Sequence, residues 1–384
     1  MELTRGQEDA VKISVERYKN HKKYTIIAGY AGSGKSTVIP YVVDAIGLHE
    51  DDVVYATFTG KASLVLRNKG CKNAMTLHKL LYFAKKLSDG DVEFSPRAQL
   101  ECGWRLIVVD EVSMVPREMW DLLLTHNVYV IALGDPGQLP PVDPDADNHL
   151  LEKPHVFLDQ IMRQAQDSGI IRLSMDIRDG KRLEYQKGND VWVIPRKKVN
   201  EGMLLGADIV ICGRNKTRRD LNKQMRKWKW GDKYTDAPIN GDKLICLHNY
   251  WKITDSLDET PLINGMIGEI SGIKLMDTKN LKPKMTAKFV AETGEVFRKD
   301  RMSIDYKMLL TGESTVNKDN WREFYKVQKP MEFDYSMAVT CHKSQGSQWD
   351  KVVVFCEQMG DYDTYIKWLY TACTRAAKKL VVVI

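Results

Sequence analysis

The sequence predicts an α/β fold of two lobes, and three observations lead to that prediction. The chain has 384 residues, more than one compact core usually serves, so two domains with insertions are expected. A short apolar strand, a glycine-rich loop and an amphipathic helix follow one another in YTIIAGYAGSGKSTVIPYVVDAIG, which begins at Tyr24. Two later apolar runs, WRLIVVDEVSM and VYVIALGDPGQLPPV, also end in polar turns, as strands do at the ligand-binding edge of a parallel α/β sheet.

The composition is that of an ordinary soluble, globular protein. Hydrophobic residues make up 43% and charged residues 28% of the chain. No run is long enough to span a bilayer, and the N-terminal stretch MELTRGQEDAVK lacks the apolar core of a signal peptide. We therefore expect a cytoplasmic protein without a membrane partner, which would act in the host cytoplasm if a virus encodes it.

The cysteines are scattered along the chain. There are seven of them, an odd number, and none forms a C-x-x-C pair. This spacing disfavours a zinc site and a disulfide framework, so buried and reduced thiols are expected.

Basic residues cluster in one stretch, RNKTRRDLNKQMRKWKW, which starts at Arg214. The formal net charge of the chain is +6, which is compatible with a polyanionic partner but also with many proteins that bind none. The stretch itself holds eight Lys or Arg residues against one acid, with two tryptophans. A solvated helix face and a nucleic-acid-binding surface explain this pattern equally well.

The glycine-rich loop satisfies the phosphate-binding pattern G-x-x-x-x-G-K-[ST], with Gly29 as its first glycine. Backbone N–H groups of such a loop wrap phosphate oxygens, helped by the positive end of the following helix. Lys35 would neutralise the β and γ oxygens of ATP, and Ser36 would hold Mg²⁺. The predicted nucleotide contacts of this loop are Gly32, Ser33, Gly34, Lys35, Ser36 and Thr37.

Acidic and amide side chains follow the two later strands. Asp110 and Glu111 come directly after the first of them, and Gln138 lies in the turn after the second. Asp110 would reach Mg²⁺ through water, while Glu111 would polarise the attacking water as a general base. Gln138 carries an amide that both donates and accepts, so it could link a γ-phosphate oxygen to a group across the cleft.

Taken in order, these and other segments resemble the motifs of superfamily 1 helicases, specifically of the 5′→3′ branch of RecD-like and Dda-like enzymes. LTRGQEDAV is similar to the adenine-reading glutamine motif, GYAGSGKST to motif I, ATFTGKAS to motif Ia and TLHKLL to motif Ib. VVDEVSM resembles motif II, LGDPGQLPPV motif III and FLDQIMRQ motif IV. Near the C-terminus, AVTCHKSQGSQWD resembles motif V and YTACTRAAKKLVVV motif VI. The resemblance covers most of the chain, and its strength comes from the order of the motifs.

The resemblance implies further nucleotide-site residues outside the glycine-rich loop. Gln7 would read the adenine ring. Arg163 and Arg375 would reach the γ-phosphoryl group from the second lobe and stabilise the charge that develops during hydrolysis. Gln345 and Gly346 would also approach the γ-phosphate, with the glycine allowing the backbone to come close. A cleft closed by arginines from another lobe tightens with ATP and opens after hydrolysis, as a motor requires.

The resemblance also implies a track for single-stranded DNA, in which hydroxyls, cations and backbone amides grip phosphates without reading sequence. The residues at the matching positions are Thr59, Lys61, Thr76, His78, Phe94, Asn215, Thr340, His342 and Lys343. His78 is open to a second interpretation, as a packed helix residue. Phe83 and Phe94 could either stack on the end base pair of a duplex or anchor their own hairpin.

The domain layout follows from the same resemblance. The first RecA-like P-loop lobe is expected at residues 1–155, with a β-hairpin insertion at 82–103 that acts as a pin and splits the duplex. A D-G turn between short amphipathic runs indicates this hairpin. The second RecA-like lobe is expected at 156–265 and 333–384. It is interrupted at 266–332 by a β-rich segment with T-G and K-D turns, where relatives carry a small SH3-like barrel.

Together these expectations describe an ATP-dependent DNA helicase that moves 5′→3′ along single strands and unwinds duplex DNA. ATP and Mg²⁺ are its expected cofactors. Its expected partners are single-stranded DNA and junctions of single- and double-stranded DNA, together with single-strand-binding or replication proteins. The resemblance connects such an enzyme with DNA replication, repair or recombination, and a monomer would suffice for the activity.

Three other functions compete with this one: an RNA helicase or translocase that removes bound proteins, a nucleic-acid-binding ATP switch, and a small-molecule kinase. The switch is disfavoured because Glu111, Gln138 and both arginines are present, whereas a dead motor would be expected to have lost one of them. The kinase is disfavoured because it leaves Gln138 and Arg375 without a task. The choice of DNA over RNA and the 5′→3′ polarity rest on the resemblance.

Overall fold

The chain forms two compact units in a computed structural model. Unit 1 comprises Met1–Phe83, Ser95–Lys198 and Ser344–Ile384, and unit 2 comprises Ala84–Phe94 and Val199–Lys343. The structure describes residues 3–86, 92–140, 149–162, 167–250, 262–276, 284–298, 300, 302–316 and 330–384.

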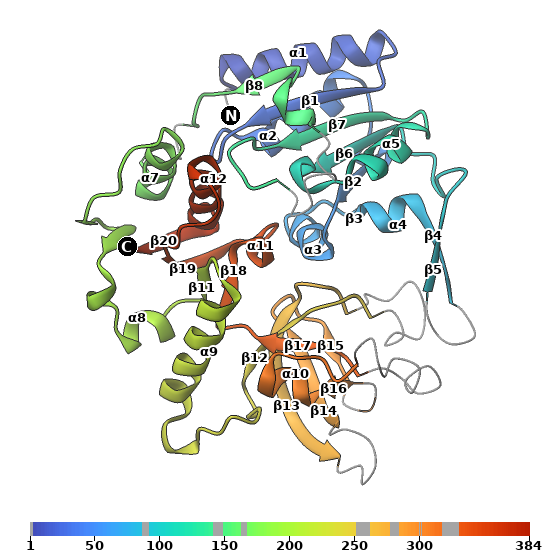
Figure 1. The fold of residues 1–384 in the computed structure, drawn as a ribbon. Helices are drawn as coiled ribbons and strands as arrows, with labels where there is room; N and C mark the ends of the chain where they lie inside the picture. Colours follow the sequence, from blue (N-terminus) through green and yellow to red (C-terminus); the bar gives the residue numbers. More distant parts are fainter. Residues whose placement is uncertain are drawn as a thin grey trace. The chain divides into compact units, whose positions relative to one another are not determined.

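A six-stranded parallel sheet forms one part of unit 1, in the order β3-β2-β6-β7-β1-β8 (Figure 1). Its strands are β1 (Tyr24–Gly29), β2 (Val53–Thr57), β3 (Ala74–Thr76), β6 (Leu106–Asp110), β7 (Tyr129–Gly134) and β8 (Val156–Leu158). The helices around it are α1 (Arg5–Lys19), α2 (Lys35–Ala45), α3 (Gly60–Asn68), α4 (Leu77–Leu81) and α5 (Arg117–Leu124). The parallel sheet predicted from the three apolar runs is confirmed, since β6, β7 and β1 are neighbours.

Alternate residues of the strands face different layers of helices. In β1, Ile27 packs in a cluster with residues of α1 and α2, while its neighbour Ile26 packs in a second cluster with residues of α4 and α5. Fully burying one such side chain stabilises the fold by roughly 1.5–3 kcal/mol. The sheet is therefore covered on both faces, which fixes the carboxyl ends of its strands as the accessible edge for a ligand.

A second group of strands belongs to unit 1. It runs in the order β19 (Trp349–Phe355), β20 (Ala376–Val383), β10 (Val191–Ile194) and β9 (Gln186–Lys187). β9 is antiparallel to β10, and the other two pairings are parallel. Helices α7 (Gly169–Arg178) and α12 (Tyr362–Cys373) pack on each other and on β20. The C-terminal segment from Ser344 thus lies in the same unit as the P-loop strand β1.

Unit 2 combines a parallel strand pair with an antiparallel sheet. The pair is β11 (Ile209–Cys212) and β18 (Ala338–Thr340), next to α8 (Glu201–Leu205) and α9 (Asn215–Trp230). The sheet has the order β15-β14-β13-β12-β17, and β16 also pairs with β14. Its elements are β12 (Lys243–Cys246), β13 (Ile267–Met276), β14 (Lys284–Ala291), β15 (Val296–Phe297), β16 (Ser303–Asp305), α10 (Tyr306–Thr311) and β17 (Phe333–Tyr335). Because β12 and β17 belong to it, the sheet extends beyond the expected insertion at 266–332 on both sides.

A separate strand pair, β4 (Tyr82–Lys86) and β5 (Val92–Pro96), lies where the hairpin is expected. The D-G turn between them lies outside the described residues. Phe83 is 55% and Phe94 is 38% exposed, which leaves both rings open to solvent. The guanidinium carbon of Arg97 lies 5.5 Å from the centroid of the Phe83 ring, so a cation–π contact holds this ring to the chain that follows β5.

Membrane and disulfide features can be judged over the described part of the chain. There, no helix combines the length and hydropathy that crossing a bilayer requires. The seven cysteines are free thiols. Burial raises the pKa of Cys246 and of Cys356 to about 12, which keeps both thiols protonated and unreactive.

Candidate functional site

The P-loop connects β1 to α2, and glycines shape it. Gly32 and Gly34 have φ angles of 81° and 77°, in the left-handed region that favours glycine, and Gly34 is the N-cap of α2. Lys35 folds back onto the loop, with its Nζ 2.6 Å from the carbonyl oxygen of Gly29 and 3.2 Å from that of Tyr30. The ammonium group is thus held by neutral acceptors that the oxygens of a phosphate could replace.

Gln7 connects α1 to the P-loop. Its Oε1 accepts a hydrogen bond from the backbone N–H of Thr4 at 3.0 Å, which completes the capping box at the start of α1. Its Nε2 donates to the carbonyl oxygen of Ser33 at 3.2 Å, and the side chain is buried. Gln7 therefore braces the loop in this structure, and its reading of adenine stays a prediction.

Asp110 and Glu111 lie where β6 ends. Glu111 has a φ angle of 54°, a left-handed conformation that costs a non-glycine residue on the order of 1–3 kcal/mol. Its backbone N–H donates to Oδ1 of Asp110 at 3.0 Å. Burial, followed by the Glu111 carboxylate, raises the pKa of Asp110 to about 6, while Lys35 opposes the rise. Such a buried carboxylate would be stabilised by a further cation.

The residues present fit a magnesium ion that arrives with a nucleotide. Among the described residues there is no cluster of three or more His, Cys, Asp or Glu side chains. Mg²⁺ does not need one, because it usually keeps several waters and binds one or two protein oxygens plus phosphates. Ser36, beside Thr37 in the first turn of α2, is exposed, and Asp110 offers a carboxylate with a raised pKa.

A turn after β7 places a buried carboxylate near the P-loop. Asp135 is 1% exposed, and its Oδ2 lies 4.0 Å from Nζ of Lys35. Its Oδ1 accepts from the N–H of Gly137 at 2.9 Å, and its Oδ2 accepts from the hydroxyl of Tyr370 at 2.7 Å. The same hydroxyl accepts from the N–H of Ala31, in the P-loop, at 2.8 Å.

Sequence reasoning missed both Asp135 and Tyr370. Asp135 directly follows a predicted strand, three residues before Gln138, and that position is the signal that could have identified it. Tyr370 carries no such signal, because its partner Asp135 is 235 residues away in the chain.

The C-terminal segment of unit 1 contacts the same turn. Gln138 is buried, and the next residue, Leu139, donates its N–H to Oγ1 of Thr371 at 2.9 Å. Nε2 of Gln345 donates to the carbonyl oxygen of Leu139 at 3.1 Å. The structure therefore brings Gln138 and Gln345 to one turn. Their predicted contacts with the γ-phosphate stay predictions.

Gly346 lies against the start of α3. Its φ angle is 70°, and a Cβ atom at this position would lie 3.0 Å from Oγ1 of Thr59 and 3.2 Å from Cβ of Ala62. The close approach that requires glycine here is therefore an approach to α3, whereas the sequence suggested an approach to a phosphate. On the same helix, Nζ of Lys61 lies 4.4 Å from the ring centroid of Trp349.

Of the two predicted arginines, Arg375 belongs to the described residues. Arg163 lies outside the described residues. Arg375 is buried, and its Nε donates to the carbonyl oxygen of Thr371 at 3.0 Å. Its Nη1 donates to the carbonyl oxygen of Ser347 at 3.3 Å, and its Nη2 to Oγ1 of Thr374 at 3.2 Å. The guanidinium is thus bound at the end of α12, and a contact with a γ-phosphate would replace some of these bonds.

The predicted DNA contacts of unit 1 lie at the starts of two helices. Thr59 and Thr76 are the N-caps of α3 and α4, and each hydroxyl accepts from a backbone N–H three residues on. His78 stacks on Tyr82, with ring centroids 5.8 Å apart and 28° between the planes. Burial lowers the pKa of His78, so the imidazole is neutral near pH 7. These contacts agree with the interpretation of His78 as a packed helix residue.

Three of the predicted DNA contacts of unit 2 lie where the chain passes into unit 1. Thr340 ends β18 and is buried, while His342 and Lys343 belong to α11 (Cys341–Ser344). Burial lowers the pKa of both His342 and Lys343. Nζ of Lys343 donates to Oδ1 of Asn264 at 2.7 Å. Unit 2 ends at Lys343, so the predicted motif V spans the join between the units.

Helix α9 carries the basic stretch, and its cations are divided between two faces. Arg218 and Arg226 are 7% and 2% exposed and pair with Asp334 and Asp242. These two arginines fit neither a solvated helix face nor a nucleic-acid-binding surface, because each is buried and paired with an acid within unit 2. Asn215, the first residue of the helix, is exposed, as its predicted contact with DNA requires.

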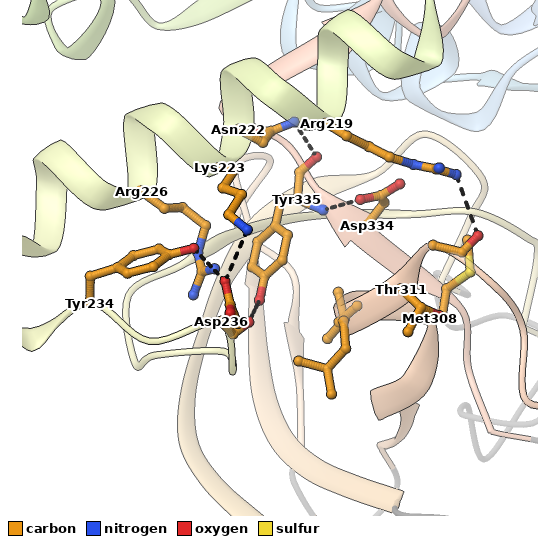
Figure 2. Close-up of a pocket in the computed structure, with 13 residues that line it drawn as sticks. Arg219, Asn222, Lys223, Arg226, Tyr234, Asp236, Met308, Thr311, Asp334 and Tyr335 are labelled. Carbon is orange, nitrogen blue, oxygen red and sulfur yellow. Dashed lines mark hydrogen bonds and ion pairs between the residues drawn. The ribbon is translucent and has the colours of Figure 1, made fainter.

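A pocket of about 120 Å³ lies beside α9 in unit 2, with Arg219 and Lys223 of this helix in its lining (Figure 2). Lys223 pairs with Asp236 at 3.5 Å, and Nδ2 of Asn222 donates to the carbonyl oxygen of Tyr335 at 3.1 Å. These polar groups of the lining thus bind one another. The pocket marks the place where α9 packs on α10 and β17.

Two family models match parts of the chain. A model described as an AAA domain matches residues 2–191, and a model described as a UvrD-like helicase C-terminal domain matches residues 335–383. The first match includes the P-loop and the ends of β6 and β7. The second includes the C-terminal segment that contacts the P-loop and the turn after β7.

Curated proteins with similar sequences include two helicases. The ATP-dependent DNA helicase dda of Enterobacteria phage T4 is 27% identical over 190 residues, which are 47% of this chain and 43% of that protein. The ATP-dependent RecD2 DNA helicase of Deinococcus radiodurans is 31% identical over 168 residues, which are 41% of this chain and 22% of that protein. The chain therefore spans less than half of the length of these relatives.

Solved structures share the fold over the whole chain. A structure of Pif1 helicases that unwind forked dsDNA has a TM-score of 0.57 and 19% identity, covering 100% of this chain and 92% of that one. A structure of the Bacteroides Pif1 helicase with ADP-AlF3 and ssDNA has a TM-score of 0.55 and 18% identity, with the same coverage. At this identity the likeness confirms the mixed α/β fold.

Proposed function

We propose that this chain, which belongs to superfamily 1 of the helicases, hydrolyses ATP to move 5′→3′ along single-stranded DNA and to unwind duplex DNA. The observation that carries the proposal is the meeting of three distant segments in unit 1. The P-loop, the turn after β7 and helix α12 are joined by the hydrogen bonds of Ala31, Asp135 and Tyr370. A phosphate site bonded to a helix near the end of the chain can couple nucleotide binding to movement, which a small-molecule kinase does not need.

The proposed hydrolysis starts at Lys35, which leaves the carbonyl oxygens of the loop and pairs with the β and γ oxygens of ATP. Glu111, fixed by its left-handed backbone at the end of β6, takes a proton from the attacking water. Ser36 and Asp110 would hold Mg²⁺, which when bound neutralises charge on the phosphates.

Further residues of this chain act on the γ-phosphoryl group. Gln138 and Gln345, brought together at the turn after β7, would sense its oxygens through their amides. Arg375 and Arg163 would stabilise the charge that develops during hydrolysis. Gln7 would hold the loop while its amide reads the adenine ring.

In this proposal the single strand binds through its phosphates, without sequence readout. Thr59 and Thr76 offer hydroxyls at the starts of α3 and α4, near Lys61 and His78 in the chain. Thr340, His342 and Lys343 bind at the join between the units, and Asn215 binds at the start of α9. We propose that the strand pair β4–β5 with Phe94 is the pin that separates the duplex.

The finer domain layout belongs to the same proposal. The two RecA-like lobes would occupy residues 1–155 and, discontinuously, 156–265 and 333–384, with an SH3-like barrel at 266–332. Such an enzyme would work as a monomer at junctions of single- and double-stranded DNA in the cytoplasm. Single-strand-binding or replication proteins are its proposed protein partners.

ATP hydrolysis measured with and without single-stranded DNA tests the proposal. We expect DNA to raise the rate in the wild-type chain, and Lys35→Ala to abolish turnover. Arg375→Ala should lower turnover by about 10³-fold or more while appreciable ATP binding remains, because the arginine stabilises only the developing charge. A normal rate in either variant would refute the site assignment. Stimulation by RNA alone would support an RNA helicase, and no stimulation by either would refute a motor.

A further inference from the structure

The hydroxyl of Tyr370 joins two loops of the phosphate site. It accepts a hydrogen bond from the N–H of Ala31 in the P-loop at 2.8 Å and donates one to Oδ2 of Asp135 at 2.7 Å. The side chain is 1% exposed, and burial, followed by the Asp135 carboxylate, raises the pKa of Tyr370. The hydroxyl therefore stays protonated and serves as donor and acceptor at the same time.

The residue after Tyr370 contacts the same turn at its other end. Oγ1 of Thr371 accepts from the N–H of Leu139 at 2.9 Å. The carbonyl oxygen of Thr371 accepts from Nε of Arg375 at 3.0 Å. One turn of α12 thus binds Ala31, Asp135 and Leu139 through its side chains and the guanidinium of Arg375 through a backbone carbonyl oxygen.

We propose that Tyr370 is a positioning residue that couples the P-loop to Arg375 through α12. This inference rests on the proposed function, in which Arg375 acts on the γ-phosphoryl group. Phosphate that draws Lys35 away from its 4.0 Å contact with Asp135 changes the charge beside the Tyr370 hydroxyl. Because α12 is one helix that ends beside Arg375, a shift of Tyr370 moves the guanidinium with it.

Tyr370→Phe tests this inference because it removes the hydroxyl and keeps the ring. We expect kcat for ATP hydrolysis without DNA to fall about tenfold, the size expected for one or two lost hydrogen bonds. The dissociation constant of a fluorescent ADP should change less than about threefold. ADP has no γ-phosphoryl group, so its binding does not depend on Arg375. The matched control is Tyr362→Phe on the same helix, whose hydroxyl donates to the Gly180 carbonyl oxygen at 3.1 Å. It should stay within about twofold of the wild type in both measurements.

A double-mutant cycle distinguishes positioning from a merely structural role. In an Arg375→Lys background, which keeps a cation, Tyr370→Phe should lower kcat by less than about threefold, because the two residues act as one unit. A full tenfold loss in that background would overturn the inference, and so would a kcat of Tyr370→Phe within twofold of the wild type.

A loss of stability in Tyr370→Phe calls for a second variant. If Tyr370→Phe lowers Tm more than Tyr362→Phe does, the test is repeated with Thr371→Val, which removes the acceptor of the Leu139 N–H. In this variant too, kcat should fall while the affinity for ADP stays nearly unchanged. Parallel loss of both in Thr371→Val would overturn the inference. If DNA fails to stimulate the wild type, the helicase proposal fails, while the DNA-free kcat still tests the coupling.

Discussion

At the scale of single residues, Glu111 combines a costly backbone conformation with a catalytic position. Its φ angle of 54° lies in a region that costs a non-glycine residue on the order of 1–3 kcal/mol. It directly follows Asp110, the last residue of β6, so the parallel sheet fixes where the strained turn begins. A glycine at this position would relieve the strain, but the chain has a glutamate here. A carboxylate at a strained position agrees with a role in the chemistry.

Glu111→Gln should lower kcat for ATP hydrolysis by about 10²–10⁴-fold and leave ATP affinity near that of the wild type. The amide keeps the size of the side chain but cannot take a proton from water. Single-turnover hydrolysis and equilibrium ATP binding measure the two quantities. The control is Glu118→Gln, an exposed residue in the first turn of α5, which should change neither. A kcat within tenfold of the wild type would mean that another group is the base.

Residues of the phosphate site were predictable to different degrees. The P-loop residues follow a local spacing, and the structure places this loop between a strand and a helix, as that spacing implies. The bonds from Tyr370 to Asp135 and Ala31 span 235 and 339 residues of sequence. No local pattern records such a contact, because it depends on how α12 packs after the whole unit has folded.

At the scale of elements, the edge of the first sheet contains a pH-sensitive hydrogen bond. The backbone N–H of Ile26 in β1 donates to Nδ1 of His155, the residue before β8, at 2.9 Å. Burial, followed by the charge of Arg17, lowers the pKa of His155. The neutral imidazole is the form that accepts this bond, so protonation breaks it.

The stability of the protein should therefore fall as the pH drops below about 6.5, the ordinary pKa of histidine. A base whose folded-state pKa is depressed contributes stability above its unfolded pKa and loses it as the pH falls through the folded value. His155→Asn keeps an acceptor near the Nδ1 position but cannot titrate. Denaturant unfolding between pH 5 and pH 8 should show a weaker pH dependence in this variant. An unchanged dependence would contradict the assignment.

Helix α9 is held to unit 2 by a buried ion pair. The side chains of Arg226 and Asp242 are both buried, and Nη2 of the arginine lies 2.9 Å from Oδ2 of the acid. Nε1 of Trp230 also donates to Oδ1 of Asp242, at 2.8 Å. The carboxylate is therefore the shared acceptor of two side chains from the C-terminal half of the helix.

Asp242→Ala should lower the free energy of unfolding by about 3–5 kcal/mol, because it leaves the buried guanidinium of Arg226 without its counter-charge. Urea unfolding followed by circular dichroism measures the loss. Asp236→Ala is the matched control, since its pair with Lys223 is exposed, and this variant should unfold near the wild-type midpoint. Equal effects of the two substitutions would contradict the role assigned to the buried pair.

The basic stretch shows why the faces of an element were hard to predict. Arg218, Asn222 and Arg226 recur every four residues, the spacing of one helix face, and all three are buried. A count of charges treats these arginines like their exposed neighbours. Their acidic partners, Asp334 and Asp242, lie 116 and 16 residues further along the chain, so no local pattern indicates the pairing.

At the scale of the whole molecule, the proposed ATP site lies in one unit, while the proposed DNA contacts lie in both. The predicted nucleotide-site residues that the structure describes, from Gln7 to Arg375, belong to unit 1. In the proposed domain layout the last of them belong to a second lobe, and this C-terminal segment forms hydrogen bonds with the P-loop and with the turn after β7. The predicted DNA contacts are shared by both units, and motif V crosses from one to the other after Lys343. Coupling between ATP and DNA would therefore pass through this short segment.

Strand separation on tailed duplexes tests the central claim most directly. The substrates carry a 5′ single-stranded DNA tail, a 3′ DNA tail or a 5′ RNA tail, and the released strand is measured with ATP and Mg²⁺. Lys35→Ala is the control for ATP dependence. We predict that the wild-type chain unwinds the duplex with the 5′ DNA tail and leaves the other two largely intact. Unwinding from the 3′ tail alone, or none at all while ATP is hydrolysed, would contradict the proposed function.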